Sequence, residues 1–407
     1  TKRGFFFIFF FLLISAICFF RPNLFIAIIN ALVWSALIVA FFWSLLATLG
    51  VRVSRLPTQD GFRGVMLKLP IRVQNLLPLP RQSFVVCEKI PFTPESWQVH
   101  VIPPLAAHEQ LDYPRTILPV RRGEFVLDKL LLRGSDPLGL FCVTRVFREE
   151  QKMLIQPAAE PISWLPLARK EKIISNEWQL HRKTPVGLDF FGVREYRPYD
   201  NVRHIDWKAT ARHQQTLVRE YEENSSYCIA ILLDLERKHV TSEHTLESNF
   251  EYLVKVAASL ANYLATIHCE VLFCAGNTPG ESIISGPSQG CRQDIMHLLT
   301  HIEPGDIPIT QQLDMIFDEI PANSIFYCLT LQDAPFFSAT FLRFLEMGID
   351  LRWIYAPPIL FADFATALGE RAFNLLPRQQ TTIVEPCIVH PRFNVMDALM
   401  LPQLSGY

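Results

Sequence analysis

The residues best suited to chemistry lie in one polar stretch, residues 187–223, in which charged side chains alternate with bulky apolar ones. Asp200, Asp206 and Lys208 match in type the carboxylates and lysine with which metal nucleases hold a metal ion and activate water. Such short patterns are common by chance. A membrane-tethered, metal-dependent hydrolase using these three residues is therefore the alternative prediction, and no catalytic residue is assigned.

Two other interpretations of this stretch need no catalysis, and they are compatible with each other. In the structural one, three arginines form bidentate ion pairs with three acids, and Trp207 is an apolar anchor against the sheet. In the docking one, exposed Arg, Tyr and Trp side chains bind a protein partner, because these types are enriched at interface hot spots. The candidate residues are Arg194, Glu195, Tyr196, Pro198, Asp200, Arg203, Asp206, Trp207, Arg212, Arg219 and Glu220.

The same stretch resembles the signature of the bacterial domain of unknown function 58 family: G-x-E/D-F, then R-E-Y-x-P-x-D-x-x-R-x-I-D-W-x-x-x-A-R, then V-R-E-Y-E. Residues 121–141, which we interpret as a strand between turns at Gly123 and Gly139, and two apolar runs at the start of the chain fit the same family. The resemblance implies a membrane-anchored protein with a von Willebrand factor A-like domain and a MoxR-type AAA+ ATPase as partner. It implies no enzymatic activity common to the family.

The resemblance also implies a place for a metal ion after the predicted strand 227–234. Von Willebrand factor A domains use Asp-x-Ser-x-Ser there, whereas this chain has Asp234-Leu235-Glu236-Arg237-Lys238, without either serine. Mg²⁺ needs several oxygen ligands, and Lys238 would bring a cation to its place. We therefore predict no cofactor, with Asp234 and Glu236 as a degenerate remnant. Asp234 is expected to cap the neighbouring helix or to pair with Arg237 or Lys238.

The elements that must position these residues indicate a doubly wound α/β sheet, which the resemblance makes von Willebrand factor A-like. The run 227–234 is almost continuously apolar, as in a buried parallel strand, and residues 246–267 carry a helical apolar stripe. Further strands at 270–275, 324–331 and 350–355 alternate with helices near 291–301, 309–320 and 335–347. Ligands of such sheets bind at the carboxyl ends of strands, where Asp234 would lie. The chain has no Walker phosphate loop, so we expect no nucleotide hydrolysis.

Residues 52–161 read as an all-β, sandwich-like domain. Short β-type runs occur at 65–73, 83–90, 97–102, 116–120, 124–132 and 141–146, with Pro, Gly and Asp turns between them. The tail from residue 372 is rich in proline and polar residues, and we expect it to be an irregular cover or partly disordered.

The start of the chain predicts a membrane anchor. Residues 5–20 and 24–49 are uncharged runs of 16 and 26 residues, and a spanning helix needs about 20 apolar residues. A signal peptide is the alternative for the first run, but a second full span follows it directly. Lys2 and Arg3 precede the first run and several bases follow the second, whereas the turn holds only Arg21. Positive charge favours the cytoplasm, so both ends should face it.

Charge and cysteine usage narrow the function classes. The net charge of the 407-residue chain is −2, yet five bases and no acid precede Asp60, so the remainder is net acidic. A net acidic region is a poor match for nucleic acid, which needs clustered positive charge. The nine cysteines include no C-x-x-C pair, which is typical of reduced thiols in a reducing compartment.

These patterns predict a two-pass protein of the bacterial inner membrane with its large C-terminal region in the cytoplasm. Its predicted function is that of a scaffold or adaptor that binds protein partners, by resemblance a MoxR-type AAA+ ATPase, in assembly or envelope maintenance. The predicted segments are a transmembrane helical hairpin (1–51), a β-sandwich-like domain (52–161), the signature segment packed on the next domain (162–226), the α/β domain (227–371) and the tail (372–407).

Overall fold

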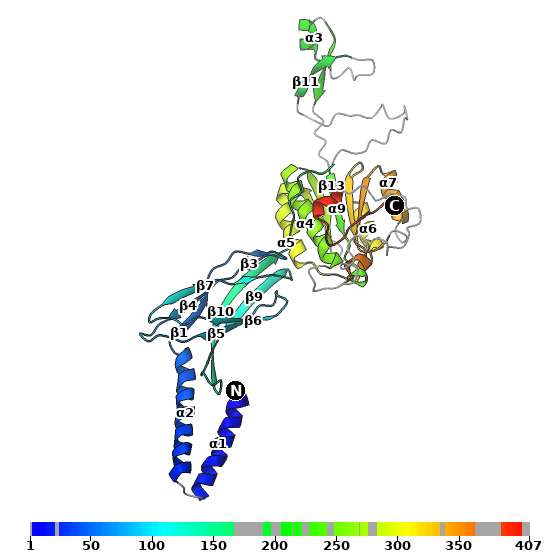
Figure 1. Cartoon of the computed structure of the whole chain (residues 1–407). Coiled ribbons are helices and arrows are strands. Elements are labelled where there is room, and N and C mark those ends of the chain that lie inside the picture. Colours follow the sequence, from blue (N-terminus) through cyan, green and yellow to red (C-terminus); the bar gives the residue numbers. More distant parts are fainter. Residues whose placement is uncertain are drawn as a thin grey trace.

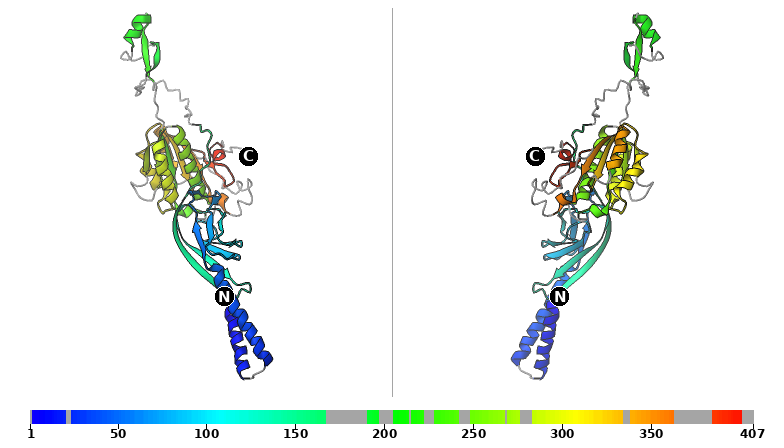
Figure 2. Two further views of the ribbon diagram at one scale, coloured as in Figure 1. Left: turned by 90° about the vertical axis from the view of Figure 1, so that its left-hand side faces the viewer. Right: turned by 90° about the vertical axis from the view of Figure 1, so that its right-hand side faces the viewer.

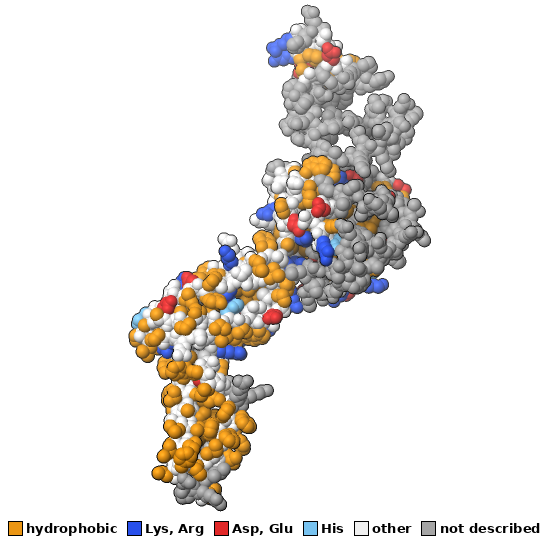
Figure 3. Space-filling model, in the orientation of Figure 1, with side chains coloured by type: hydrophobic (Ala, Val, Ile, Leu, Met, Phe, Trp, Pro, Cys, Tyr) orange, Lys and Arg blue, Asp and Glu red, His pale blue; other side chains and the backbone are white. Residues whose placement is uncertain are grey.

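The computed structural model begins with two long apolar helices that run side by side, α1 (Lys2–Phe20) and α2 (Leu24–Thr48) (Figure 1). By length and composition, α2 can cross a membrane, and α1 holds a shorter apolar helical stretch, Gly4–Ala16. Most of their large apolar side chains are exposed, and Figure 3 shows hydrophobic side chains over the visible surface of both helices. The residues that the structure describes are 2–20, 24–166, 190–196, 205–213, 215–221, 228–241, 248–267, 269–275, 283–333, 338–362 and 384–400.

Polar side chains join the two helices. Ser15 Oγ donates a hydrogen bond of 2.8 Å to Asn30 Oδ1, and Trp34 Nε1 donates one of 2.9 Å to Ser15 Oγ. Hydrogen bonds between apolar helices help them associate where the surroundings offer the polar groups no other partner. The connection therefore favours α1 and α2 as a paired unit.

The β domain consists of two main sheets packed face to face. The three-stranded sheet has the order β1-β4-β7, the five-stranded sheet the order β2-β10-β9-β5-β6, and β3 pairs with β8 alone. Val53 and Val73 of the first sheet share one buried core with Val86 and Leu130 of the second. The strands are β1 (Val51–Arg55), β2 (Gly61–Phe62), β3 (Leu67–Lys68), β4 (Ile71–Asn75), β5 (Phe84–Lys89), β6 (Trp97–Ile102), β7 (Gln110–Tyr113), β8 (Thr116–Ile117), β9 (Gly123–Ser135) and β10 (Cys142–Gln156).

Two features of this domain were not predicted from the sequence: a pair of long strands, where short, evenly spaced strands were expected, and a buried ionic cluster. β9 and β10 form a hairpin of 13- and 15-residue strands, which extends past the sandwich toward α2 (Figures 1 and 2). The domain also buries an ionic cluster, in which Glu88 accepts hydrogen bonds of 2.6 Å from Arg55 Nε and 2.5 Å from Arg115 Nη1. Burial lowers the pKa of Arg115, with the Glu88 carboxylate opposing that shift. A buried acid between two guanidinium groups is stable only while all three are present.

The C-terminal part is a six-stranded mixed sheet of order β15-β14-β13-β16-β17-β18. The strands are β13 (Cys228–Leu233), β14 (Glu270–Cys274), β15 (Ile283–Pro287), β16 (Ile325–Thr330), β17 (Asp350–Tyr355) and β18 (Cys387–Ile388). Every pair is parallel except β14–β15. The sequence pattern predicted β13, β14, β16 and β17 but not the two outer strands, which are short or weakly apolar.

Helices cover both faces of this sheet because alternate residues of each strand point to opposite faces. Ile229, Ile231 and Leu233 pack against α4 and α5, whereas Ala230 and Leu232 pack against α6 and α7. The helices are α4 (Asn249–Ile267), α5 (Ser288–His301), α6 (Ile309–Phe317), α7 (Ser338–Glu346) and α9 (Val395–Met400), with 3₁₀ helices η2 (Arg237–His239) and η4 (Pro358–Phe361).

The C-terminal tail is more ordered than its composition indicated. β18 pairs in parallel with β17, and α9 packs on α4. Val389, Val395 and Ala398 are fully buried in the same core as β13. The expectation of an irregular tail is therefore wrong for these residues, since a few apolar side chains are enough to close the sheet edge.

The signature stretch contributes a small unit of its own, formed by β11 (Phe190–Glu195), β12 (Leu217–Tyr221) and α3 (Trp207–His213). We call it the signature module. In Figure 1 it lies at the opposite end of the molecule from α1 and α2, beyond the amino ends of the central strands, since β13 begins shortly after β12 ends.

Candidate functional site

The signature module is built on a β-hairpin. β11 and β12 pair antiparallel, with Glu195 opposite Leu217 and a register shift between Phe190 and Gly192. Asp206 begins α3: its Oδ1 accepts hydrogen bonds of 3.0 Å each from the backbone N–H groups of Lys208 and Ala209. This is the geometry of a helix N-cap, in which the carboxylate satisfies amides that lack helical partners. Asp206 is therefore a structural residue.

Apolar side chains of the module face solvent. Trp207 is 69% exposed, Val193 44% and Tyr196 38%. The structural interpretation expected Trp207 to be an apolar anchor against the sheet, and in this structure it is not buried. An exposed tryptophan on the same small unit as an exposed tyrosine and valine is instead typical of a protein-binding surface. Ile205, 8% exposed, pairs with Val218 and supplies the small apolar interior of the module.

Part of the predicted site lies outside the described residues. Pro198, Asp200 and Arg203 are among these, and the side chains of Arg194, Arg219 and Glu220 are too. The predicted arginine–acid pairs therefore stay predictions. Of the residues proposed for hydrolysis, Lys208 is exposed and Asp206 is the N-cap of α3. Arg212, a candidate docking residue, is also exposed. Within the described residues, no group of three metal-binding side chains comes together.

The carboxyl edge of the central strands places Asp234 between β13 and β16. Asp234 is fully buried, and its two oxygens each accept a 2.9 Å hydrogen bond from the backbone, one from Glu236 and one from Leu331. Burial raises the pKa of Asp234 from 3.8 to about 7, against the opposing effect of the two amides. The sequence-based expectation of a helix cap or a pair with Arg237 or Lys238 is not what the geometry gives. Asp234 instead ties two loops together.

Glu236 closes the same edge. Gln332 Nε2 donates a 3.0 Å hydrogen bond to Glu236 Oε2, and the backbone of Glu236 forms a parallel bridge with Gly305. The switch point of the sheet, where such folds bind ligands, is thus filled by groups that satisfy one another. Both carboxylates at this edge are engaged in hydrogen bonds within the protein, and the described residues bring no third metal-binding side chain to them.

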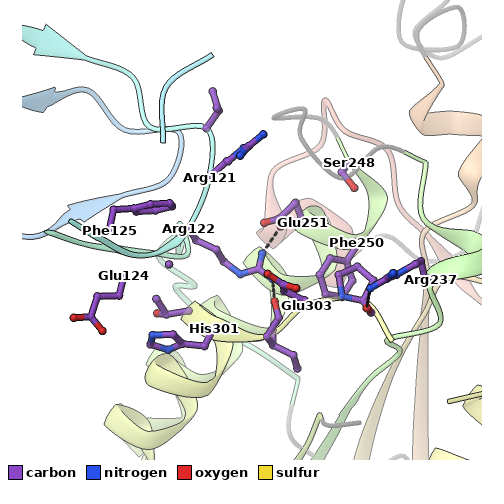
Figure 4. A pocket seen from close by; sticks show the side chains of 15 residues that line it. Arg121, Arg122, Glu124, Phe125, Arg237, Ser248, Phe250, Glu251, His301 and Glu303 are labelled. Carbon is purple, nitrogen blue, oxygen red and sulfur yellow. Dashed lines mark hydrogen bonds and ion pairs between the residues drawn. The ribbon is translucent and has the colours of Figure 1, made fainter. Parts of the chain in front are cut away.

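A pocket of about 530 Å³ lies where the β domain meets the α/β domain (Figure 4). Arg122, next to the first residue of β9, enters it and forms an ion pair with Glu251 of α4. Its Nε donates a 2.7 Å hydrogen bond to the Leu299 carbonyl, and Nη2 donates to the Ile302 carbonyl. Because helix carbonyls at a C-terminus carry partial negative charge, the guanidinium stabilises the end of α5.

A second arginine supports this joint. Arg63 Nε lies 3.4 Å from Glu251 and donates a 2.8 Å hydrogen bond to the Val120 carbonyl, and burial lowers the pKa of Arg63. The Arg122 guanidinium also lies 5.3 Å from the centre of the Phe250 ring. We call Arg63, Arg122 and Glu251 the interdomain clamp. From the sequence, residues 121–123 were predicted only as a turn. The available signal was a pair of arginines at the start of a strand.

Arg122 is engaged with Glu251 and with two carbonyl groups, and Arg237 donates a hydrogen bond to the Pro304 carbonyl. These contacts fix the two domains relative to each other. The signature module, with its exposed aromatic residues, is the candidate functional site, and the clamp positions the domain that carries it.

Comparison with known proteins agrees with the signature. A curated relative is the "Uncharacterized protein YeaD" of Bacillus subtilis (strain 168), 25% identical over 206 residues, which are 48% of each chain. This chain thus spans about half the length of that relative. Among solved structures, a PapD-like domain of human CEP192 matches 27% of this chain and 87% of its own at 12% identity and a TM-score of 0.18. Beta-glucosidase 3B of Thermotoga neapolitana matches 26% of this chain and 17% of its own at 18% identity and a TM-score of 0.14.

TM-scores this low establish no shared fold. The match to a family model is more informative. It begins inside β11 and ends in the turn after α6, so it covers most of the signature module and the first half of the α/β domain. Residues 192–322 of this chain match the model of the family described as protein of unknown function DUF58.

Proposed function

We propose that this protein is a membrane-anchored scaffold whose signature module docks a protein partner. The observation that carries the proposal is the 69% exposure of Trp207 on a folded hairpin–helix unit, with Tyr196 and Val193 exposed on the same unit. Exposed apolar side chains gathered on one small folded unit are a feature of interaction surfaces. Tryptophan and tyrosine are the types that dominate interface energetics.

The partner class in this proposal is a MoxR-type AAA+ ATPase. Its support is the resemblance of residues 187–223 to the family signature, together with the match of residues 192–322 to the family model. A von Willebrand factor A-like assignment of the α/β domain belongs to the same proposal. Its support is the parallel order β14-β13-β16-β17 with helices on both faces.

The anchor in this proposal is a two-pass hairpin with the large region in the cytoplasm. Support comes from the length of α2, from the Ser15–Asn30–Trp34 hydrogen bonds between the helices, and from the bases that flank the pair. A helix of 25 residues is about 37 Å long, which exceeds the roughly 30 Å hydrocarbon core. The topology is tested by labelling an introduced cysteine, Asn23→Cys, with a membrane-impermeant thiol reagent. Labelling from outside intact cells would support the topology, and labelling only from the cytoplasmic side would contradict it.

The docking proposal is tested with the full chain in detergent and a purified MoxR-type AAA+ ATPase from the same cell. Trp207→Ala should weaken binding by about 30-fold or more, as truncating a hot-spot tryptophan costs at least about 2 kcal/mol. Trp97→Ala is the matched control, because Trp97 is also an exposed tryptophan, 50% accessible, but on β6.

Both variants should unfold at the temperature of the parent protein, since neither side chain is buried. Equal affinity of the Trp207→Ala variant and the parent would refute the role of the module. Absence of binding by the parent chain, with and without nucleotide, would refute the partner class.

A further inference from the structure

The turn between β9 and β10 carries apolar side chains toward the membrane helices. We call residues 136–141 (Asp-Pro-Leu-Gly-Leu-Phe) the hairpin tip. Leu138 at its apex is 64% exposed, and Phe141 packs edge-on against Phe41 of α2 with ring centres 5.7 Å apart. Figure 1 shows this turn beside α2, well beyond the sandwich from which the hairpin extends. The tip thus lies against the helix that is apolar enough to cross a membrane.

Close packing fixes the hairpin on α2. A Cβ atom placed on Gly134 would lie 2.7 Å from Thr48 Cγ2 and 2.8 Å from Ala47 Cβ, so only glycine fits there. Arginines hold the helix end from the same side: Arg81 donates a 2.6 Å hydrogen bond to the Leu46 carbonyl, and Arg145 donates one of 2.9 Å to the Thr48 carbonyl. The depth of the tip is therefore tied to that of α2.

The depth follows from helix geometry. Phe41 lies seven residues before the last residue of α2, which is roughly 10 Å along the axis. If α2 is centred in the bilayer, its last residue lies in the headgroup region and Phe41 lies roughly 7 Å inside the hydrocarbon core. Phe141 contacts Phe41, so the tip reaches past the headgroups into the outer part of the acyl chains. Arg145 on β10 is then at headgroup level, where basic side chains meet lipid phosphates.

The tip is also built for an apolar medium. Backbone polar groups that enter lipid must find partners within the protein. Asp136 provides them: its carboxylate accepts hydrogen bonds of 2.9 Å from the Leu138 amide and 2.6 Å from the Phe141 amide, and its carbonyl accepts one of 3.0 Å from Gly139. Asp136 itself is 3% exposed. The turn thus directs apolar side chains outward while its amides are satisfied inside.

We propose that the hairpin tip inserts into the cytoplasmic leaflet of the membrane beside α2, as a third membrane contact that fixes the orientation of the β domain. The lipid bilayer is its occupant. This inference rests on the proposed membrane anchor, since the tip reaches the acyl chains only if α2 crosses the membrane. A short apolar turn backed by basic residues is the composition of an interfacial contact.

The test uses the full chain reconstituted in vesicles that contain anionic lipid, with an environment-sensitive fluorophore on one introduced cysteine. The background carries Cys142→Ser, because Cys142 is exposed next to the tip. Leu138→Cys reports the tip. Val126→Cys is the matched control: it is an exposed apolar position on β9, 51% accessible, nine residues before the strand ends and roughly 30 Å away. Leu32→Cys, at an exposed position within α2, reports the anchor.

The expected result is strong quenching of the Leu138 probe by lipids that carry a quencher near the headgroup. Its quenching by aqueous iodide should be several-fold weaker than that of the Val126 probe. Adding Gly134→Leu, which removes the fit to α2, should raise iodide quenching at Leu138 toward the Val126 level.

Each contrary outcome has one meaning. If the Leu32 probe is quenched by lipid and the Leu138 probe behaves like Val126, the tip is in water and the inference fails while the anchor stands. If the Leu32 probe is also in water, the proposed anchor fails. A Leu138 probe shielded from both quenchers is covered by protein, such as a second copy of the chain, and this too overturns insertion.

Discussion

Replacing Glu251 with alanine should open the joint between the β domain and the α/β domain more than replacing Arg122. Glu251 is the shared acid of the interdomain clamp, and the side chains of Arg63 and Arg122 are only 9% and 6% exposed. Glu251→Ala removes the carboxylate that two buried guanidinium groups share. Breaking a buried pair in this way costs about 3–5 kcal/mol.

Arg122→Ala should lower the free energy of opening the joint by less. Glu251 keeps Arg63 at 3.4 Å, and water can enter the pocket of about 530 Å³ to solvate the carbonyls that Arg122 leaves. Charge-assisted hydrogen bonds contribute about 1.5–3 kcal/mol each, and partial replacement by water brings the loss near 2 kcal/mol. These values correspond to opening equilibria raised by more than 100-fold for Glu251→Ala and by about 30-fold for Arg122→Ala.

Amide hydrogen exchange of the full chain in detergent measures this opening directly. The reporting amides lie in the last turn of α5, where the Ile302 amide donates to the Leu298 carbonyl at 2.9 Å. Arg72→Ala is the control, because Arg72 forms an ion pair with Asp112 on the surface of the β domain and should leave α5 unchanged. Faster exchange in Arg122→Ala than in Glu251→Ala, or equal exchange in all three variants, would refute the shared-acid account.

Three further predictions follow from buried and exposed groups. Because burial raises the pKa of Asp234 to about 7, the native state keeps a proton that the unfolded chain releases above about 3.8. The free energy of unfolding should therefore fall by up to about 4 kcal/mol as pH rises from 4 to 7. In denaturant titrations, Asp234→Asn should flatten this pH dependence. The same pH dependence in both proteins would contradict the prediction. Glu88→Ala should destabilise the β domain by about 3–5 kcal/mol in the same titrations, since it strands Arg55 and Arg115, whereas a loss below about 1 kcal/mol would show that the cluster is solvated. A maleimide should label exposed Cys142 well before buried Cys328, whose pKa burial raises, and peptide mapping of labelled protein would detect the reverse order.

The interior of the α/β domain was predictable because its signals are local. A continuous apolar run at 228–233 and a 3.6-residue stripe at 249–267 each require one kind of element wherever they occur. The length of the uncharged run 24–49 likewise predicted a helix able to span a membrane, and the structure has α2 there. The outer strand β18 escaped prediction because two residues carry no periodicity, and only pairing with β17 makes them a strand.

The site residues divide in the same way. Residue types in 187–223 were enough to single out the signature, and the chain order placed Asp234 after a strand. The hydrogen-bond partners of these groups were not predicted. Asp206 accepts hydrogen bonds from amides two and three residues on, whereas Asp234 accepts one from the amide of Leu331, 97 residues away.

By itself, then, the sequence determined the apolar helices, the central strands and the signature, since each depends on neighbours within one element. Only the tertiary structure decided that Arg122 clamps two domains, that Leu331 and Asp234 close the carboxyl edge of the sheet with a hydrogen bond, and that the hairpin tip lies against α2. These contacts join residues about 100 or more positions apart. Their energies depend on burial and geometry that exist only once the chain has folded.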